Sequence, residues 1–189
     1  MKRTIAAILA IIILMLLAAA HAEDGYVGSH PAQSIFVTQT RNRTCTLISA
    51  TMMVRNYSHR AGNGYEHITE SVVGKTGWNS KGLSHSFSVG DISVTVNKDI
   101  KNHADKKAYL IDILRQHPEG VVIYDSGAPH AIFLFGYDAA TDIFYCADTT
   151  TKVAGKAITL EESIIKGDTQ QAKIDTIDRI WHITNKIGG

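Results

Sequence analysis

The chain has 189 residues and a formal net charge of +1, because 19 Lys and Arg residues nearly balance 18 Asp and Glu residues. This balance gives no reason to expect nucleic acid or an anionic membrane surface as a partner. The sequence contains no internal repeat, heptad pattern or low-complexity tract, and its three prolines provide no long rigid linker.

Residues 1–22 have the pattern of a secretory signal peptide. A basic head at Lys2 and Arg3 precedes an uncharged apolar body, and the tripeptide AHA at 20–22 forms a small-x-small cleavage site. The apolar body is shorter than the roughly 18 to 20 residues of a comfortable membrane span. We therefore expect a secreted or extracytoplasmic protein with no integral membrane domain after signal removal. Membrane anchoring by an uncleaved signal is the alternative.

Residues 23–189 have the size of one domain with a single hydrophobic core. The two cysteines, Cys45 and Cys146, are too few for a fold that depends on several disulfides, although one bridge between them stays open. Neither a CxxC nor an HExxH motif is present, and the histidines are spread singly along the chain. The sequence therefore spells out no four-ligand zinc site.

The first predicted helix begins at Cys45. Apolar residues recur at spacings of three and four, at Leu47, Ala50, Val54 and Tyr57. This period predicts a helix that is buried over much of its girth, with Thr44 as a candidate N-cap. Cys45 then lies in the first turn, where unpaired N–H groups and the helix dipole favour a thiolate. Taken alone, a cysteine is more often core filler, and a nucleophile also needs a base and an orienting group.

The remaining elements change from helices to strands along the chain. Residues 66–75 predict a short helix, 74–90 a loop, 92–96 a half-buried strand and 103–116 a second helix; β-prone runs follow at 121–124, 131–135, 143–146, 157–160 and 179–184. This order predicts an α+β domain whose helices pack against one antiparallel sheet. Trp78, within the predicted loop, either lines a cleft or caps the edge of the core.

His130 and Asp148 lie at the outer ends of two predicted strands that a turn at 138–141 joins. If the hairpin is centred on Ala139, paired residue numbers sum to 278 and His130 lies directly across from Asp148. A loop centred half a residue later makes the sum 279 and places the two residues on opposite faces. The sequence leaves both registers open. His130 is still the best candidate for a catalytic base, because no other histidine has a strand-paired carboxylate.

Four features occur together in one order. They are Gln39 placed six positions before Cys45, the helix TCTLISATMMVRNY, the segment HPEGVVIYDSGAPHAIFLFGYD and the segment FYCADTT. As a set they resemble the secreted bacterial relatives of the bacteriocin-processing peptidases. These are papain-like cysteine peptidases, related to the domains that remove double-glycine leader peptides in bacteriocin-exporting transporters. The resemblance runs from about Gln39 to the final strand.

The resemblance implies a papain-like fold, with the nucleophile on a buried helix of an N-terminal helical part that packs against an antiparallel sheet. It implies that Cys45 is the nucleophile, His130 the general base and acid, and Asp148 the residue that orients the imidazole. Gln39 matches the oxyanion donor, together with a backbone N–H near Cys45. The implied substrate is a peptide or protein, and no metal or organic cofactor is required.

Three features depart from the family pattern. Thr44 and Thr46 flank Cys45 where many relatives have aspartate and glycine, and the β-branched Thr46 is expected to crowd the substrate cleft. Thr149 replaces the usual proline after the orienting aspartate. The transporter portion is absent, so cleavage of double-glycine leaders is not implied.

Three functions stay open at this stage. The first is a cysteine peptidase or amidase that acts on peptides or cell-wall cross-bridges. The second is a binding module that keeps the cleft without turnover, and the third is a transglutaminase-like acyl transferase. Strand alternation places Cys146 on the face of Asp148, so Cys146 either fills the core or forms a reversible disulfide with Cys45 that silences the enzyme.

Overall fold

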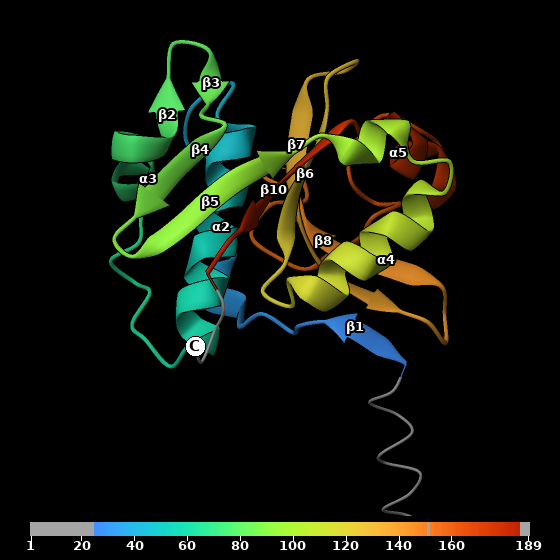
Figure 1. Cartoon of the computed structure of the whole chain (residues 1–189), viewed down its shortest axis with the longest axis horizontal. Helices are drawn as coiled ribbons and strands as arrows, with labels where there is room; N and C mark the ends of the chain where they lie inside the picture. The colour runs from blue at the N-terminus through green and yellow to red at the C-terminus, as the bar shows by residue number, and fades with distance from the viewer. Residues whose placement is uncertain (1–24, 151, 186–189) are drawn as a thin grey trace, which may run out of the picture.

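A computed structural model describes residues 25–150 and 152–185. The predicted signal peptide and residues 23, 24, 151 and 186–189 lie outside the described part. An antiparallel sheet of eight strands forms the centre of the molecule, with helices on both faces (Figure 1). The predicted α+β class is confirmed, with the Cys45 helix packed against an antiparallel sheet. Within the two described ranges, no helix is long and apolar enough to cross a membrane.

The helices are α2 Cys45–Arg60, α3 Glu70–Gly77, α4 Lys106–Gln116 and α5 Gln170–Thr176, with 3-10 turns η1 Gln33–Ile35 and η2 Asp99–Asn102. The large sheet has the spatial order β4 Ser86–Val89, β5 Ile92–Asn97, β10 Arg179–Ile183, β6 Val121–Asp125, β7 His130–Asp138, β8 Ile143–Ala147 and β9 Ile158–Thr159. The short strand β1 Tyr26–Gly28 pairs with the C-terminal part of β7. A separate hairpin joins β2 Trp78–Asn79 to β3 Gly82–Leu83.

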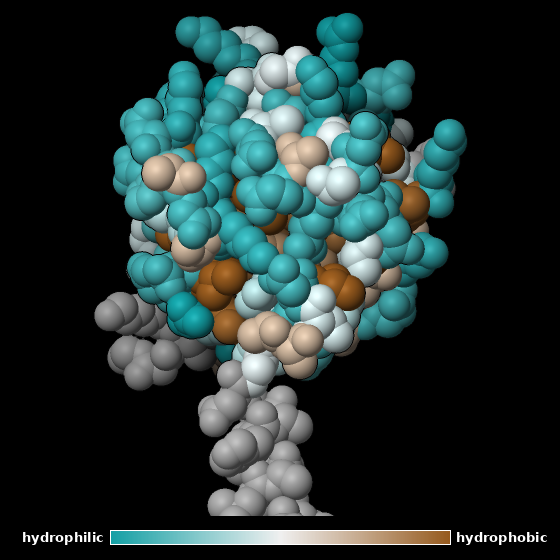
Figure 2. Space-filling view, turned by 90° about the vertical axis from the view of Figure 1, so that its right-hand side faces the viewer, coloured by the Kyte–Doolittle hydropathy of each residue, from teal (hydrophilic) through white to brown (hydrophobic). Residues whose placement is uncertain are grey.

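Two hydrophobic clusters cover opposite faces of the sheet, because successive strand residues point to opposite sides. Ala131 and Phe133 of β7 pack in the cluster that includes α2 and α3. Ile132 and Leu134 pack in the cluster that includes α4 and α5. Figure 2, which views the molecule from the side of α4 and α5, shows a mostly hydrophilic surface with scattered apolar residues. The sheet therefore contributes one face to each hydrophobic cluster.

α2 has the burial that its sequence predicts. It begins at Cys45, and 12 of its 16 residues are buried. The buried Ser49 hydroxyl donates a hydrogen bond of 3.3 Å to the carbonyl of Ala131 on β7. This contact joins the first turns of α2 to the start of β7. In Figure 1 the N-terminus of α2 lies at the same end of the molecule as the β2–β3 hairpin.

Several element boundaries differ from those predicted. Residues 74–90, predicted as a loop, contain β2, β3 and β4, whose lengths of two to four residues leave little periodic pattern. α3 begins only at Glu70, because the side chain of Thr69 caps it by accepting the N–H of Val72. Likewise α4 begins at Lys106, after the Asp105 cap. β1 and α5 were not predicted.

Candidate active site

Both registers considered for the β7–β8 hairpin are wrong. Asp138 pairs with Ile143, so paired numbers sum to 281 next to the turn, whereas Leu134 pairs with Cys146 and the sum is 280 further along. The unpaired Phe135 between these pairs is a β-bulge in β7. An odd sum would place residues 130 and 148 on opposite faces, and an even sum places them on one face. The bulge therefore changes the sum from odd to even, which places His130 and Asp148 on the same face of the sheet.

His130 and Asp148 are in direct contact. The Nε2 atom of His130 hydrogen-bonds to Oδ1 of Asp148 at 2.9 Å, and both residues are buried. The contact leaves Nδ1 of the imidazole for a second partner, and the Cys45 side chain is near enough to His130 for each group to shift the pKa of the other. Cys45, His130 and Asp148 come from the start of α2, the start of β7 and the residue after β8. The structure thus brings together three of the four predicted site residues.

The electrostatics of the pair favour charge separation. Burial alone raises the pKa of the Cys45 thiol, but the hydrogen bond and charge of His130, with backbone groups of Ala131 and Thr46, lower it below the ordinary value. Burial alone lowers the pKa of His130, but hydrogen bonds to Asp148 and Cys45, and their charges, raise it to about 9. These opposite shifts favour the thiolate–imidazolium pair over the neutral thiol–imidazole pair.

Asp148 is held as a carboxylate. It is fully buried, which raises its pKa, but the hydrogen bond and charge of His130 lower that pKa below its ordinary value. Two backbone donors add to this effect, the N–H of Ile164 at 2.9 Å from Oδ2 and the N–H of Thr150 at 3.2 Å from Oδ1. All the carboxylate contacts therefore stabilise the charged form and fix its orientation toward His130.

A buried lysine holds one of those donors in place. The Nζ atom of Lys173 donates to the carbonyls of Ser163 and Ile165, at 2.8 and 2.7 Å. Ile164, whose N–H reaches Asp148, lies between these two residues. Lys173 is only 4% exposed, so its ammonium group is committed to this segment. No spacing in the sequence connects Lys173 to the site.

The start of α2 leaves its N–H groups available. Thr44 occupies the predicted N-cap position, but its side chain makes no cap bond. Its hydroxyl donates instead to the carbonyl of Arg41 at 2.9 Å. The first-turn N–H groups beside Cys45 can therefore face a thiolate or an oxyanion.

Gln39 lies next to the loop that carries Asp148. Its backbone N–H donates to the carbonyl of Thr149 at 3.1 Å, and the Thr149 hydroxyl donates to its Oε1 at 3.2 Å. The Gln39 amide nitrogen donates to the carbonyl of Arg41 at 2.5 Å, which uses one of its two hydrogens. Gln39 is not part of the lining of the cleft described below, so its role as oxyanion donor stays a prediction. Thr149, the residue in place of proline, fixes its orientation.

Cys45 opens into a cleft with a volume of about 690 Å³. The β2–β3 hairpin forms one wall, and the neighbouring ends of β6, β7 and β10 form the other. Trp78 lines this cleft and also packs against the core, so both expectations for it are met. Thr46, which is 8% exposed, lines the cleft beside Cys45, where a β-branched side chain was expected to crowd it.

Cys146 does not belong to the site. It is fully buried in the cluster beneath α4 and α5, whereas Cys45 packs against the cluster on the other face. Burial raises the pKa of the Cys146 thiol well above its ordinary value. Both thiols are free, so the structure holds no Cys45–Cys146 disulfide, and Cys146 fills the core.

Sequence reasoning missed Asp125, which pairs directly with His130 across the β6–β7 ladder. Asp125 is 2% exposed, and its Oδ1 accepts the N–H groups of Gly127 and Ala128 at 2.7 and 3.3 Å. These bonds fix the turn that leads into His130. The segment Asp125-Ser126-Gly127 after a β-prone run is a turn signal that could have indicated this role.

Comparison of the chain with protein-family models, curated proteins and solved structures finds no match. The geometry of the site and the sequence pattern therefore carry the interpretation. In the part of the chain that the structure describes, no group of three or more His, Cys, Asp or Glu side chains is placed to hold a metal ion.

Proposed function

We propose that the protein is a secreted cysteine peptidase-like hydrolase that cleaves a peptide or amide bond. The observation that carries this proposal is the convergence of Cys45, His130 and Asp148 beside a cleft. Nucleophile, base and orienting acid are the three parts that covalent catalysis by a thiol requires. The resemblance to the papain-like bacteriocin-processing peptidases supports the same proposal, and we propose the papain-like fold for this chain.

In the proposed reaction, the Cys45 thiolate attacks the carbonyl carbon of the scissile bond and forms a C–S bond. Backbone N–H groups in the first turn of α2 stabilise the oxyanion, and Gln39 adds its second amide hydrogen. The His130 imidazolium gives its proton to the departing amine, which leaves a thioester on Cys45. His130 then takes a proton from water, the hydroxide attacks the thioester, and the acid product leaves.

Asp148 acts through His130 rather than on the substrate. Its carboxylate accepts the Nε2–H of the imidazole, which leaves Nδ1 for the proton exchange with Cys45. It also stabilises the imidazolium that exists before the proton reaches the leaving amine. The substrate in this proposal is a peptide or protein outside the cytoplasmic membrane, as the signal-peptide pattern at residues 1–22 supports.

A peptide-library digest tests the proposed function. Protein produced from the full-length chain is incubated with randomised peptides, and products are identified by mass spectrometry. Wild type should cleave, Cys45→Ser should not, and His130→Ala should lose about 10²- to 10⁴-fold in rate. His67→Ala is the matched control, since His67 is exposed on a different segment. Equal products from wild type and Cys45→Ser would contradict the proposal.

The position of Thr46 favours a second candidate, a peptide-binding module that does not turn over. Its β-branched side chain, which is 8% exposed, lines the cleft next to the nucleophile, where many members of the resembled family have glycine. If wild type binds peptides without cleaving them, and Thr46→Gly cleaves them, the binding module is the native function. An added amine separates hydrolysis from acyl transfer, because a transferase product carries that amine.

A further inference from the structure

All the charged side chains that line the cleft beside Cys45 are basic. Arg43, Lys81 and Arg179 belong to its lining, and no acidic residue does. The whole chain carries a formal charge of only +1, so the positive charge is concentrated locally. A concave surface lined by one sign of charge raises the local concentration of ligands of the opposite sign.

Arg179 is oriented before any ligand arrives. Its Nε donates to Oδ1 of Asp178 at 3.1 Å, and its guanidinium carbon lies 4.8 Å from the ring centroid of Tyr124. Oδ2 of the same Asp178 accepts the backbone N–H and the hydroxyl of Ser126. In the described part of the chain, the terminal nitrogens of Arg179 take part in no hydrogen bond. A guanidinium held in this way presents a fixed pair of donors, which suits a carboxylate.

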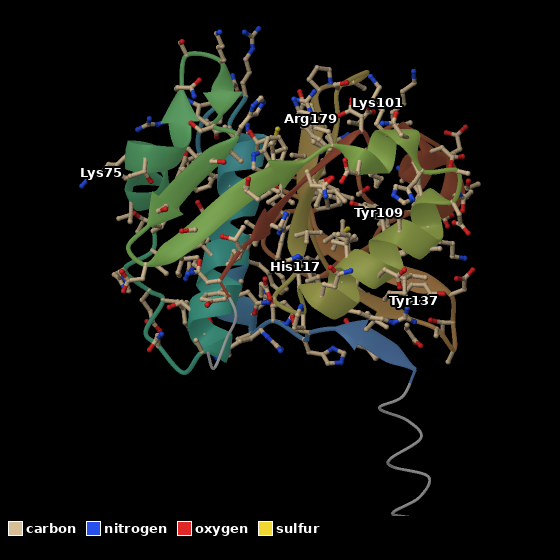
Figure 3. The ribbon with its side chains drawn as sticks, in the orientation of Figure 1. Lys75, Lys101, Tyr109, His117, Tyr137 and Arg179 are labelled. Atoms are coloured by element: carbon tan, nitrogen blue, oxygen red, sulfur yellow. The ribbon has the colours of Figure 1, made fainter. Side chains whose placement is uncertain are left out.

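Lys81 and Arg43 place further positive charge on two other sides of the cleft. Lys81 lies at the turn of the β2–β3 hairpin, and Arg43 lies just before α2. Both side chains are exposed, and among the described residues neither takes part in a salt bridge. Figure 3 shows Arg179 at the end of the sheet where the β2–β3 hairpin also lies.

Aromatic rings provide the apolar part of the same cleft. The partly exposed Trp78 and Tyr124 line it with Trp181, which is only 2% exposed and whose indole N–H donates to the carbonyl of Ser84 at 2.9 Å. Partly exposed aromatic rings next to an oriented guanidinium suit an extended organic ligand with an anionic group better than a small inorganic ion. A peptide that carries a carboxylate has both properties.

We infer that this cleft binds a carboxylate of its substrate, so that peptides with an acidic side chain or a free C-terminal carboxylate next to the scissile bond are preferred. The inference rests on the proposed function, since it names the substrate class of the same site. Each exposed charge pair contributes a factor of about 2 to 5, so Lys81 and Arg43, together with the donors of Arg179, which is itself paired with Asp178, give a preference of about ten-fold. Added salt reduces that preference, because the cleft is open to solvent.

The test uses matched peptides. From the peptides that wild type cleaves in a randomised decapeptide mixture, pairs are made that differ only by Glu or Gln next to the cut, or only by a free or amidated C-terminus. The first pair measures recognition of an acidic side chain and the second recognition of a terminal carboxylate. We expect kcat/KM to be about ten-fold higher for the acidic member of at least one pair, and Lys81→Gln to reduce this ratio about two- to five-fold. Lys75→Gln, the same charge change on the outer side of α3 (Figure 3), should keep the ratio.

The outcomes separate this inference from the proposed function. If wild type cleaves but both ratios are near one and Lys81→Gln leaves them unchanged, the inference is overturned and the peptidase proposal stands. If no form cleaves, binding of the same randomised decapeptides to Cys45→Ala is measured. Selective retention of acidic peptides that Lys81→Gln weakens then supports carboxylate recognition without hydrolysis. Retention without acidic preference, or no retention, overturns the inference as well.

Discussion

At the scale of single residues, the site depends on the partners of His130. Burial disfavours the imidazolium, whereas Asp148 and Cys45 both favour it, and their sum raises the pKa of His130 to about 9. The same coupling lowers the pKa of Cys45, so the two groups titrate as a pair. Removal of either partner should therefore be visible in the titration of the other.

Replacing Asp148 with Asn should lower the pKa of His130. The substitution removes the carboxylate charge while burial of the imidazole remains, so the pKa should fall well below about 9. The alkaline limb of the kcat/KM profile should move to lower pH, and the rate should fall about 10²- to 10⁴-fold. An NMR titration of His130 measures the shift of its pKa directly. Asp112→Asn is the control, because its exposed pair with Arg115 lies on α4, and an unshifted His130 in Asp148→Asn would contradict the account.

The His130–Asp148 pair should also appear in the pH dependence of stability. In Cys45→Ser the thiol no longer contributes, and His130 keeps a pKa that is raised in the folded state relative to its ordinary 6.5. The stability that this raised pKa adds to the folded state is fully present below the pKa of His130 in the unfolded chain, and it is lost as the pH rises through the pKa of His130 in the folded state. We expect the free energy of unfolding of Cys45→Ser to fall by about 1 to 3 kcal/mol over this range. Urea denaturation of Cys45→Ser/His130→Gln should lack the decline, and an equal decline in the double variant would contradict the assignment.

At the scale of elements, the sequence predicted what periodic burial determines. α2 was predicted from its start at Cys45, and the strands near residues 121–124 and 143–146 were found, because each buries a regular face over several residues. The hairpin register was wrong because the turn lies at 139–142, between the paired Asp138 and Ile143, and the bulge at Phe135 then shifts the pairing by one more residue. Gly136 was the available signal, since a glycine inside a strand often accompanies a bulge or a close approach, and a Cβ there would overlap Tyr26.

The segment that Lys173 holds gives a prediction at the same scale. In Lys173→Met the carbonyls of Ser163 and Ile165 lose their donor, so the N–H of Ile164 should hold Asp148 less firmly. The pKa of Asp148 should rise, the pKa of His130 should fall, and the alkaline limb of the kcat/KM profile should move to lower pH. Lys166→Met, an exposed neighbour, is the matched control. If Lys173→Met is less stable but keeps an unchanged pH profile, Lys173 supports only the fold and does not position Asp148.

At the scale of the whole molecule, the cleft unites segments that the sequence keeps far apart. Cys45, the β2–β3 hairpin and Arg179 meet only because the sheet places β10 between β5 and β6. No local pattern carries that information, so the charged cleft could not be proposed from the sequence. The triad could, because the helix, the hairpin and the family resemblance each leave a pattern in the sequence. Cys146 is a similar case, since its distance from Cys45 follows from the face of the sheet on which each cysteine packs.

The separation of the two cysteines predicts a thiol count. A thiol reagent should modify one thiol rapidly in the native protein, because Cys45 is partly exposed and Cys146 is fully buried. It should modify two thiols after unfolding without a reductant. No reactive thiol in the unfolded, unreduced protein would reveal a disulfide and contradict the observed packing.

The most direct test of the central claim, that His130 activates Cys45, is the pH dependence of Cys45 alkylation by iodoacetamide, followed by intact-mass spectrometry. In wild type, the first midpoint of modification should lie below the ordinary pKa of a thiol, and Cys45→Ser should remain unmodified. In His130→Ala the midpoint should move upward, because burial of the thiol is then opposed only by backbone groups. The same midpoint in wild type and His130→Ala would contradict the account.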